Sequence, residues 1–195
     1  IAAEDQRFYQ HWGVDVLGVA RAIIGNITSG GVQSGASTIT QQVAKNFYLS
    51  NERTFTRKFN EALLAYKIEQ SLSKDQILEL YFNQIYLGQR AYGFAAAAQI
   101  YFNKPVQELT LAEASMLAGL PKAPSAFNPV VNPERAKLRQ AYILNNMQEL
   151  GMITPQQKAQ AMAEELHYER FVQQIDQSAL YVAEMARQEL YEKYG

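Results

Sequence analysis

The sequence contains no cysteine and only two histidines, His11 and His167. Disulfides, thiolate nucleophiles and cysteine-based metal sites are therefore excluded, as is a metal site built from several histidines. Long hydrophobic runs are also lacking: the longest run of small apolar residues covers 93–98, whereas a membrane-crossing helix needs roughly 18–20 apolar residues. The first residues do not resemble a signal peptide. Because the sequence begins without Met, we interpret it as a fragment whose anchor or export signal would lie upstream.

An excess of charge of one sign is lacking too. The 18 Lys and Arg residues balance the 19 Asp and Glu residues, for a formal net charge of -1. This balance argues against a general nucleic-acid binder, whose affinity comes from neutralising many phosphates. The 195 residues are 48% hydrophobic and 19% charged, which excludes general disorder and allows a sizeable core. The length fits one domain, or one domain with a small lobe.

Signals for helix starts and ends are frequent, whereas strand-like alternation is scarce, so the sequence predicts a mainly α fold. Ser73–Gln76 and Thr110–Glu113 are capping boxes. Asn132-Pro133 and Thr154-Pro155 each supply an N-cap residue followed by proline in the first turn. The expected helices cover about 15–27, 38–47, 54–71, 74–88, 111–119, 133–150, a segment from 155, and 178–194.

Two of the expected helices carry an apolar stripe that we expect to face the core. In the expected helix over 38–47, the residues Ile39, Val43 and Phe47 follow an i, i+4, i+8 pattern. In the helix over 54–71 the corresponding residues are Phe55, Phe59, Leu63 and Tyr66. The aromatic residues between 81 and 102 are expected to line the core or a groove.

The adjacent acids Glu4 and Asp5 are the first candidates for chemistry. Their side chains point in different directions on a helix or a strand, so both cannot face one ligand in the same way. One interpretation is that one acid reacts while the other holds the local backbone. The alternative is an acidic turn favoured by the dipole of a following helix. His11 is expected to be a hydrogen-bonded structural histidine.

A helix start rich in uncharged hydrogen-bonding groups follows at 37–46. Thr38, Gln41, Gln42 and Lys45 share one polar face of this helix. Hydroxyls, amides and one Lys near free backbone N–H groups suit a phosphate or polyhydroxyl ligand. The alternative is an ordinary amphipathic helix with a solvated face, although such faces usually mix Glu with Lys.

Cations exceed acids between 45 and 61. Lys45, Arg53, Arg57 and Lys58 stand there against Glu52 and Glu61. Arg57 and Glu61 are four residues apart and can form a simple helix pair worth roughly 0.3–0.5 kcal/mol. The alternative is an anion clamp, since Arg binds phosphate through two hydrogen bonds and Lys acts as a point charge. Glu61 would then be a metal ligand or would orient the cations.

These segments together resemble the peptidoglycan glycosyltransferase domain, glycosyltransferase family 51, of class A penicillin-binding proteins and monofunctional transglycosylases. The resemblance rests on four ordered motifs and a weaker fifth over 135–151. The four are Glu4-Asp5-x-x-Phe8-x-x-His11-x-Gly13, Gly35-x-Ser37-Thr38-Ile39-Thr40-Gln41-Gln42-x-x-Lys45-Asn46, Arg57-Lys58-x-x-Glu61 and Ile77-Leu78-Glu79-x-Tyr81-x-Asn83-x-Ile85-Tyr86-x-Gly88. Ala36 and Asn103 depart from the family pattern, in which glycine is usual at both places.

The resemblance implies a lysozyme-like helical domain with a smaller membrane-apposed lobe. It implies a glycosyltransferase domain over 1–176 and a helix over 177–195 that leads toward a transpeptidase domain. The implied reaction polymerises lipid II into β-1,4-linked glycan strands and releases undecaprenyl pyrophosphate, at the periplasmic face of the bacterial inner membrane. The implied partners are lipid II, the growing glycan, the membrane lipid surface and other cell-wall synthesis proteins.

The same resemblance assigns roles to individual residues. Glu4 would be the general base, and Glu61 the second essential acid and a ligand of a divalent cation, Mg or Mn. The implied donor-site residues are Arg21, Ser37, Thr38, Gln41, Gln42, Lys45, Arg53, Arg57 and Lys58.

Two other functions are consistent with parts of the sequence. A lysozyme-like muramidase or lytic transglycosylase would share the fold, but it must protonate a glycosidic oxygen and does not use a diphosphate clamp. A non-catalytic docking module would make Glu4 and Glu61 ordinary surface acids.

Overall fold

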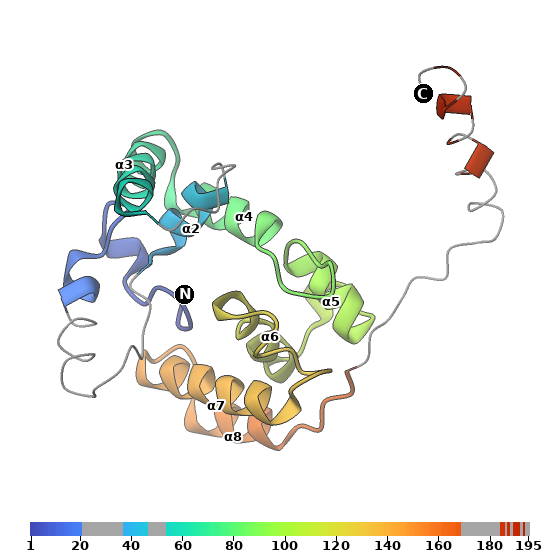
Figure 1. The fold of residues 1–195 in the computed structure, drawn as a ribbon. Coiled ribbons are helices and arrows are strands. Elements are labelled where there is room, and N and C mark those ends of the chain that lie inside the picture. The colour runs from blue at the N-terminus through green and yellow to red at the C-terminus, as the bar shows by residue number, and fades with distance from the viewer. Residues whose placement is uncertain are drawn as a thin grey trace.

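The computed structural model describes residues 1–20, 37–46, 54–168 and, near the C-terminus, 184, 185, 187, 189–191 and 193. In these residues the backbone is helical apart from turns, loops and one isolated antiparallel bridge between Tyr86 and Tyr92. The mainly α prediction is therefore confirmed (Figure 1). The α-helices are α2 (Ile39–Asn46), α3 (Phe55–Ser71), α4 (Lys74–Gln84), α5 (Phe94–Phe102), α6 (Leu111–Leu117), α7 (Pro133–Glu149) and α8 (Pro155–Ala163), and the short 3-10 helices are η1 (Phe8–Gln10), η2 (Val106–Glu108) and η3 (Leu120–Lys122).

The helix starts follow the capping signals in the sequence. The capping boxes at Ser73 and Thr110 are formed, and Thr154 forms a third with Gln157. Asn132 stands at the N-cap of α7, but its side chain makes no capping bond and donates instead to the carbonyl oxygen of Ser125. The positions of these starts were thus predicted correctly, although the role of Asn132 was not.

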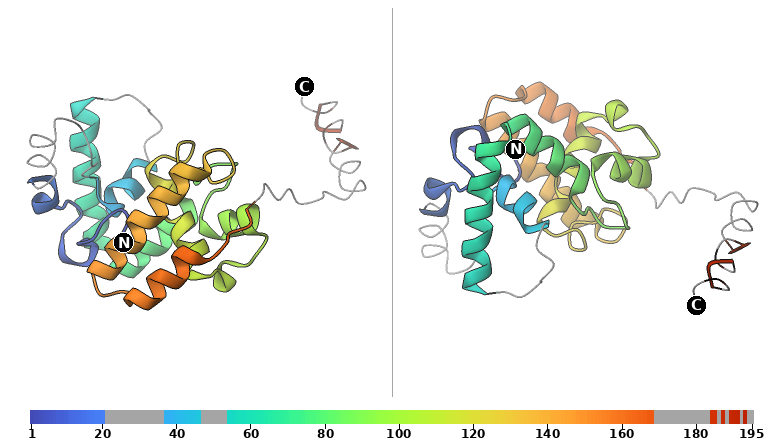
Figure 2. Two further views of the ribbon diagram at one scale, coloured as in Figure 1. Left: turned by 90° about the horizontal axis from the view of Figure 1, so that it is seen from below. Right: turned by 90° about the horizontal axis from the view of Figure 1, so that it is seen from above.

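The helices form two groups with the N-terminal segment between them (Figures 1 and 2). In one group α2 packs against α3 and α4, and in the other α6 packs against α7 and α8. A buried cluster around Ile39, Val43 and Phe8 holds the first group together. A second cluster around Leu87, Tyr101 and Leu117 joins α5 to α6. The first residues of the chain contact both groups, since Glu4 accepts hydrogen bonds from Gln42 on α2 and from Arg139 on α7.

The prediction for the apolar residues of α3 is wrong. Phe55 is 98% exposed and Phe59 64% exposed, and Leu63 and Tyr66 are also exposed. The buried face of α3 carries Glu61 and Ala65 instead. The reason is a close backbone contact: a Cβ atom added to Gly13 would lie 2.9 Å from the carbonyl of Ala65, so the N-terminal segment packs directly on this face. The apolar stripe is consequently turned to the outside.

The turn before α5 provides a test of local strain. Gly93 has φ +81° and ψ 159°, a region nearly restricted to glycine, and an added Cβ would lie 2.7 Å from the Asn83 carbonyl oxygen. We expect Gly93→Ala to lower the free energy of unfolding by at least about 2 kcal/mol, measured by urea denaturation. Gly151 is the control, because its φ is +71° but no atom lies within 4 Å of the added Cβ. Gly151→Ala should cost only about 1 kcal/mol, and equal losses would contradict this account.

Candidate active site

Asp5 fixes the N-terminal segment to the start of α2. Its buried carboxylate accepts a hydrogen bond from the backbone N–H of Ile39 at 3.0 Å and lies 2.9 Å from Nε2 of His11. Nδ1 of His11 accepts from the backbone N–H of Gly13 at 3.2 Å, so Nε2 carries the proton donated to Asp5. His11 is therefore the structural histidine expected from the sequence, and Asp5 holds the backbone.

Glu4 points away from Asp5 and is held from two helices. Its Oε2 accepts from Nε2 of Gln42 on α2 at 3.2 Å, and its Oε1 accepts from Nη2 of Arg139 on α7 at 3.1 Å. Burial raises the pKa of the Glu4 carboxyl above its ordinary value, while Arg139 and Gln42 act in the opposite direction. The carboxylate is thus partly desolvated and oriented through one bond to each oxygen.

Two of the predicted ligand-binding residues have a structural role at the start of α2. Thr38 Oγ1 accepts from the backbone N–H of Gln41 at 3.1 Å, and Gln41 Oε1 accepts from the backbone N–H of Thr38 at 3.0 Å. Thr38 Oγ1 also donates to the carbonyl oxygen of Gly13. Both side chains are buried. The expected single polar face of α2 is therefore divided: Thr38 and Gln41 point inward, whereas Gln42 reaches Glu4.

The cationic group forms around Glu61, which is buried on α3. Lys58 Nζ lies 3.0 Å from Glu61 Oε2 and donates to Ser37 Oγ at 2.9 Å, while Arg57 pairs with Glu61 Oε1. Burial lowers the pKa of the Lys58 ammonium, and the positive charges of Arg57 and Lys45 add to this effect. The structure therefore brings together Ser37, Arg57, Lys58 and Glu61, with the charge of Lys45 acting on Lys58. Arg21 and Arg53 lie outside the described residues.

The segment 37–46 connects the two acids. Ser37, just before α2, contacts Lys58 beside Glu61, and Gln42, in α2, contacts Glu4. Glu4 and the cationic group thus both contact the same short segment of the chain. One group can accept a proton, and the other can bind an anion.

The described residues offer little for a metal ion. No group of three or more His, Asp or Glu side chains occurs among them, and both oxygens of Glu61 already contact a cation. Magnesium usually takes one or two carboxylates together with phosphate oxygens and water. These residues therefore do not fit a metal held by the protein alone, and no chemical step below involves a metal.

Sequence analysis missed Arg139. It lies in the weak fifth motif, on the buried side of α7 with Ala136, Gln140 and Ile143. The spacing of the apolar residues on this helix indicates that position 139 faces inward, and an inward arginine needs a buried acid as partner. Only the structure identifies that acid as Glu4.

The helical fold thus brings a desolvated carboxylate, Glu4, and a cationic group to one short segment. A sequence model of the family described as Transglycosylase matches residues 1–148, and the chain belongs to this transglycosylase family. The glycosyltransferase assignment from the sequence is thereby confirmed at the level of the family.

Individual relatives agree with this assignment. The chain is similar to penicillin-binding protein 1A of Neisseria cinerea, with 86% identity over 195 residues, and to penicillin-binding protein 1A of Pseudomonas aeruginosa, with 53% identity over 195 residues. Each alignment covers 100% of this chain and 24% of the relative. The crystal structure of penicillin-binding protein 1A from Haemophilus influenzae matches with a TM-score of 0.52 and 36% identity, over 80% of this chain and 20% of that one. The predicted lysozyme-like helical fold is consistent with this match.

The adjacent acids should differ in their effect on stability. Asp5→Ala leaves the buried N–H groups of His11 and Ile39 without their acceptor, so we expect it to lower the free energy of unfolding by about 3 kcal/mol or more. Glu4→Gln keeps an oxygen for Arg139 and should change that free energy by less than about 1 kcal/mol. Urea denaturation of both variants measures the difference. If Glu4→Gln were the more destabilising, the division of roles between the two acids would be wrong.

Proposed function

We propose that this chain polymerises lipid II into β-1,4-linked glycan strands by inverting transfer from a polyprenyl diphosphate donor. The observation that carries the proposal is that one short segment, 37–46, contacts both Glu4, through Gln42, and the Glu61 cationic group, through Ser37. The chain covers 24% of the length of its relatives. We therefore also propose, and do not take from the relatives, that the longer protein has this activity. We propose in addition that it acts in bacterial cell-wall synthesis at the periplasmic face of the inner membrane, beside other cell-wall synthesis proteins.

Glu4 acts as the general base in this reaction. A sugar 4-hydroxyl is a weak nucleophile until its proton is removed, and a carboxylate with a raised pKa removes it more effectively. The proton passes to a free lone pair of the Glu4 carboxylate as the bond from the 4-oxygen to the donor C1 forms. The bond from C1 to the diphosphate oxygen breaks on the opposite face, so an α-linked donor gives a β-linked product.

The cationic group stabilises the leaving group. A departing diphosphate needs no proton, but its growing negative charge needs fixed positive charge nearby. Lys58, Arg57 and Lys45 provide that charge, and Ser37 adds a hydroxyl next to Lys58. Glu61 holds Arg57 and Lys58 in place through its two oxygens. If a Mg or Mn ion binds with the donor, Glu61 is the residue that would hold it, and the ion would supply further positive charge to the leaving group.

One observation favours the second candidate, a muramidase or lytic transglycosylase. Such an enzyme needs a protonated carboxyl, and burial raises the pKa of Glu4 in that direction. Arg139 and Gln42 oppose this effect, because both donate hydrogen bonds that stabilise the ionised form. The cationic group around Glu61 has no function in cleaving a neutral glycan. Polymerisation therefore accounts for more of the site.

The base assignment is tested by Glu4→Gln. Glutamine keeps the shape and the oxygen bonded by Arg139 but cannot take a proton, so we expect polymerisation of lipid II to fall by at least about 100-fold. Lipid II binding should stay within about threefold. Lys45→Ala should instead weaken both lipid II binding and turnover. The measurement is glycan formation from labelled lipid II, with finished glycan as a parallel substrate. Near-normal turnover by Glu4→Gln, or consumption of finished glycan alone, would refute the proposal.

We also propose that the outer face of α3 rests on the membrane surface. This face presents Phe55, Phe59, Leu63 and Tyr66, and an apolar hollow of about 400 Å³ continues it. The hollow is lined by Arg7, His11, Trp12, Val14, Asp15, Val16, Leu17 and Tyr66. None of the helices in the described ranges has the length and hydropathy needed to cross a bilayer. In this arrangement the polyprenyl tail of the donor can stay in the lipid while its diphosphate reaches the inner face of α3.

The membrane face is tested by the double change Phe55→Ser and Phe59→Ser. Each phenylalanine contributes roughly 1.5–3 kcal/mol when fully transferred from water, so binding to phospholipid vesicles should fall by at least about tenfold. Vesicle flotation measures this effect. The control is Leu138→Ser on α7, which is 72% exposed but belongs to the other helix group. If both variants lost binding equally, α3 would not be the membrane face.

A further inference from the structure

We propose that Arg139 is a positioning residue of the reaction, which orients the carboxylate of Glu4 and keeps it able to accept the proton. The inference rests on the proposed function, since it concerns the base of that reaction. It assigns a role to a residue outside the four stronger motifs.

The geometry ties one guanidinium nitrogen to two adjacent residues. Nη2 of Arg139 donates to Glu4 Oε1 at 3.1 Å and to the backbone carbonyl oxygen of Ala3 at 3.1 Å. Because Arg139 binds both the Glu4 side chain and the backbone of the preceding residue, it fixes the direction in which the Glu4 side chain points from the backbone. Gln42 fixes the other oxygen from α2. The lone pairs of Glu4 that remain are those available to a substrate hydroxyl.

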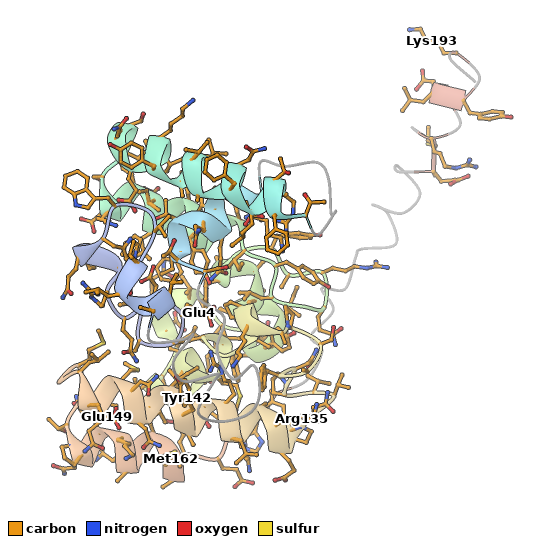
Figure 3. The ribbon with its side chains drawn as sticks, turned by 60° about the vertical axis from the view of Figure 1, so that its left-hand side comes forward. Glu4, Arg135, Tyr142, Glu149, Met162 and Lys193 are labelled. Carbon is orange, nitrogen blue, oxygen red and sulfur yellow. The ribbon has the colours of Figure 1, made fainter. Side chains whose placement is uncertain are left out.

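Arg139 is itself held firmly. Its guanidinium carbon lies 4.9 Å from the ring centre of Tyr142 and 5.8 Å from that of Phe127. Figure 3 shows Tyr142 on the part of α7 next to Glu4, with Arg135 farther along the same helix. Glycine at 119 leaves room for the arginine stem, because a Cβ there would lie 2.9 Å from Arg139 Cγ. These contacts hold a side chain that is only 8% exposed in one conformation.

The charges around Glu4 show why one cation is needed there. Asp5 lies next in the chain, and the hydroxyl of Tyr81 on α4 lies near both acids: burial raises the pKa of Tyr81, and the charges of Glu4 and Asp5 add to this effect. Gln42 on α2, which binds the other oxygen of Glu4, is neutral. Arg139 is thus the cationic side chain that offsets desolvation of the base. Without it, Glu4 would hold its proton at higher pH and could not take another.

The test compares Arg139→Gln with Arg139→Lys by the pH dependence of kcat/KM for lipid II. The acid limb of this profile reports the pKa of the free base. Loss of an adjacent cation shifts such a pKa upward by about 1–2 units. We therefore expect the limb of Arg139→Gln to move up by about that amount and kcat/KM at neutral pH to fall by at least about tenfold. Arg139→Lys should restore most of the position of the limb.

The matched control is Arg135→Gln, which removes the same charge from an exposed position on the same helix and should leave the profile unchanged. Gly119→Ala is a second variant, because it displaces the arginine stem without changing any charge, and it should lower kcat more than it raises KM. An acid limb that stays in place in Arg139→Gln, with activity lost only in proportion to unfolded protein, would overturn the proposal.

A readout that does not depend on turnover separates this inference from the proposed function. The carboxyl carbon signal of Glu4, assigned by its loss in Glu4→Gln, can be titrated by 13C NMR in the parent and in Arg139→Gln. An upward shift of the Glu4 pKa in Arg139→Gln supports the pairing even if lipid II is not the substrate. An unchanged pKa refutes the role of Arg139 even if polymerisation is confirmed.

Discussion

The carboxylate of Asp5 accepts hydrogen bonds from the backbone N–H of Ile39 and the ring N–H of His11, and the position of the site depends on these two bonds. The bond to Ile39 fixes the N-terminal segment against the start of α2. The bond to His11 continues through Gly13 to Thr38, and Gly13 also packs on the backbone of Ala65. Removing Asp5 would release a segment that carries Glu4 one residue away. Asp5 thus determines where Glu4, the proposed base, lies.

Glu4 and Glu61 are both largely buried, yet their charged surroundings differ. Glu4 has one cationic side-chain partner, so the pKa of its carboxyl remains raised by burial and the group keeps basic character. Glu61 has two cationic partners, Arg57 and Lys58, which occupy both of its oxygens. The two acids therefore differ in the number of cationic side chains that contact them.

Local signals in the sequence predicted where the helices begin better than they predicted which face of a helix is buried. Capping boxes such as Ser73–Gln76 determine helix starts, because their bonds join residues three apart. The cationic group around Glu61 was also predictable, since Arg57 and Lys58 lie within one turn of it. The pairing of Glu4 with Arg139 joins residues 135 apart in sequence, and no local pattern specifies it. The orientation of α3 was mispredicted because an apolar stripe in a sequence does not show whether that stripe packs on the protein core or contacts a different apolar environment.

The reversed orientation of α3 relates the candidate site to the proposed membrane face. An ordinary surface helix buries its apolar face and exposes its charges. In α3 the apolar face, with Phe55 and Phe59, is outside, while Glu61 on the opposite side is buried beside two cations. In water alone this arrangement would not stabilise the protein, because the apolar side chains remain exposed to water while the charged groups lose their hydration. A substrate with a lipid tail and a diphosphate head matches both faces at once: the tail needs an apolar phase outside the helix and the head needs cations inside it. The orientation of α3 and the proposed donor therefore account for each other.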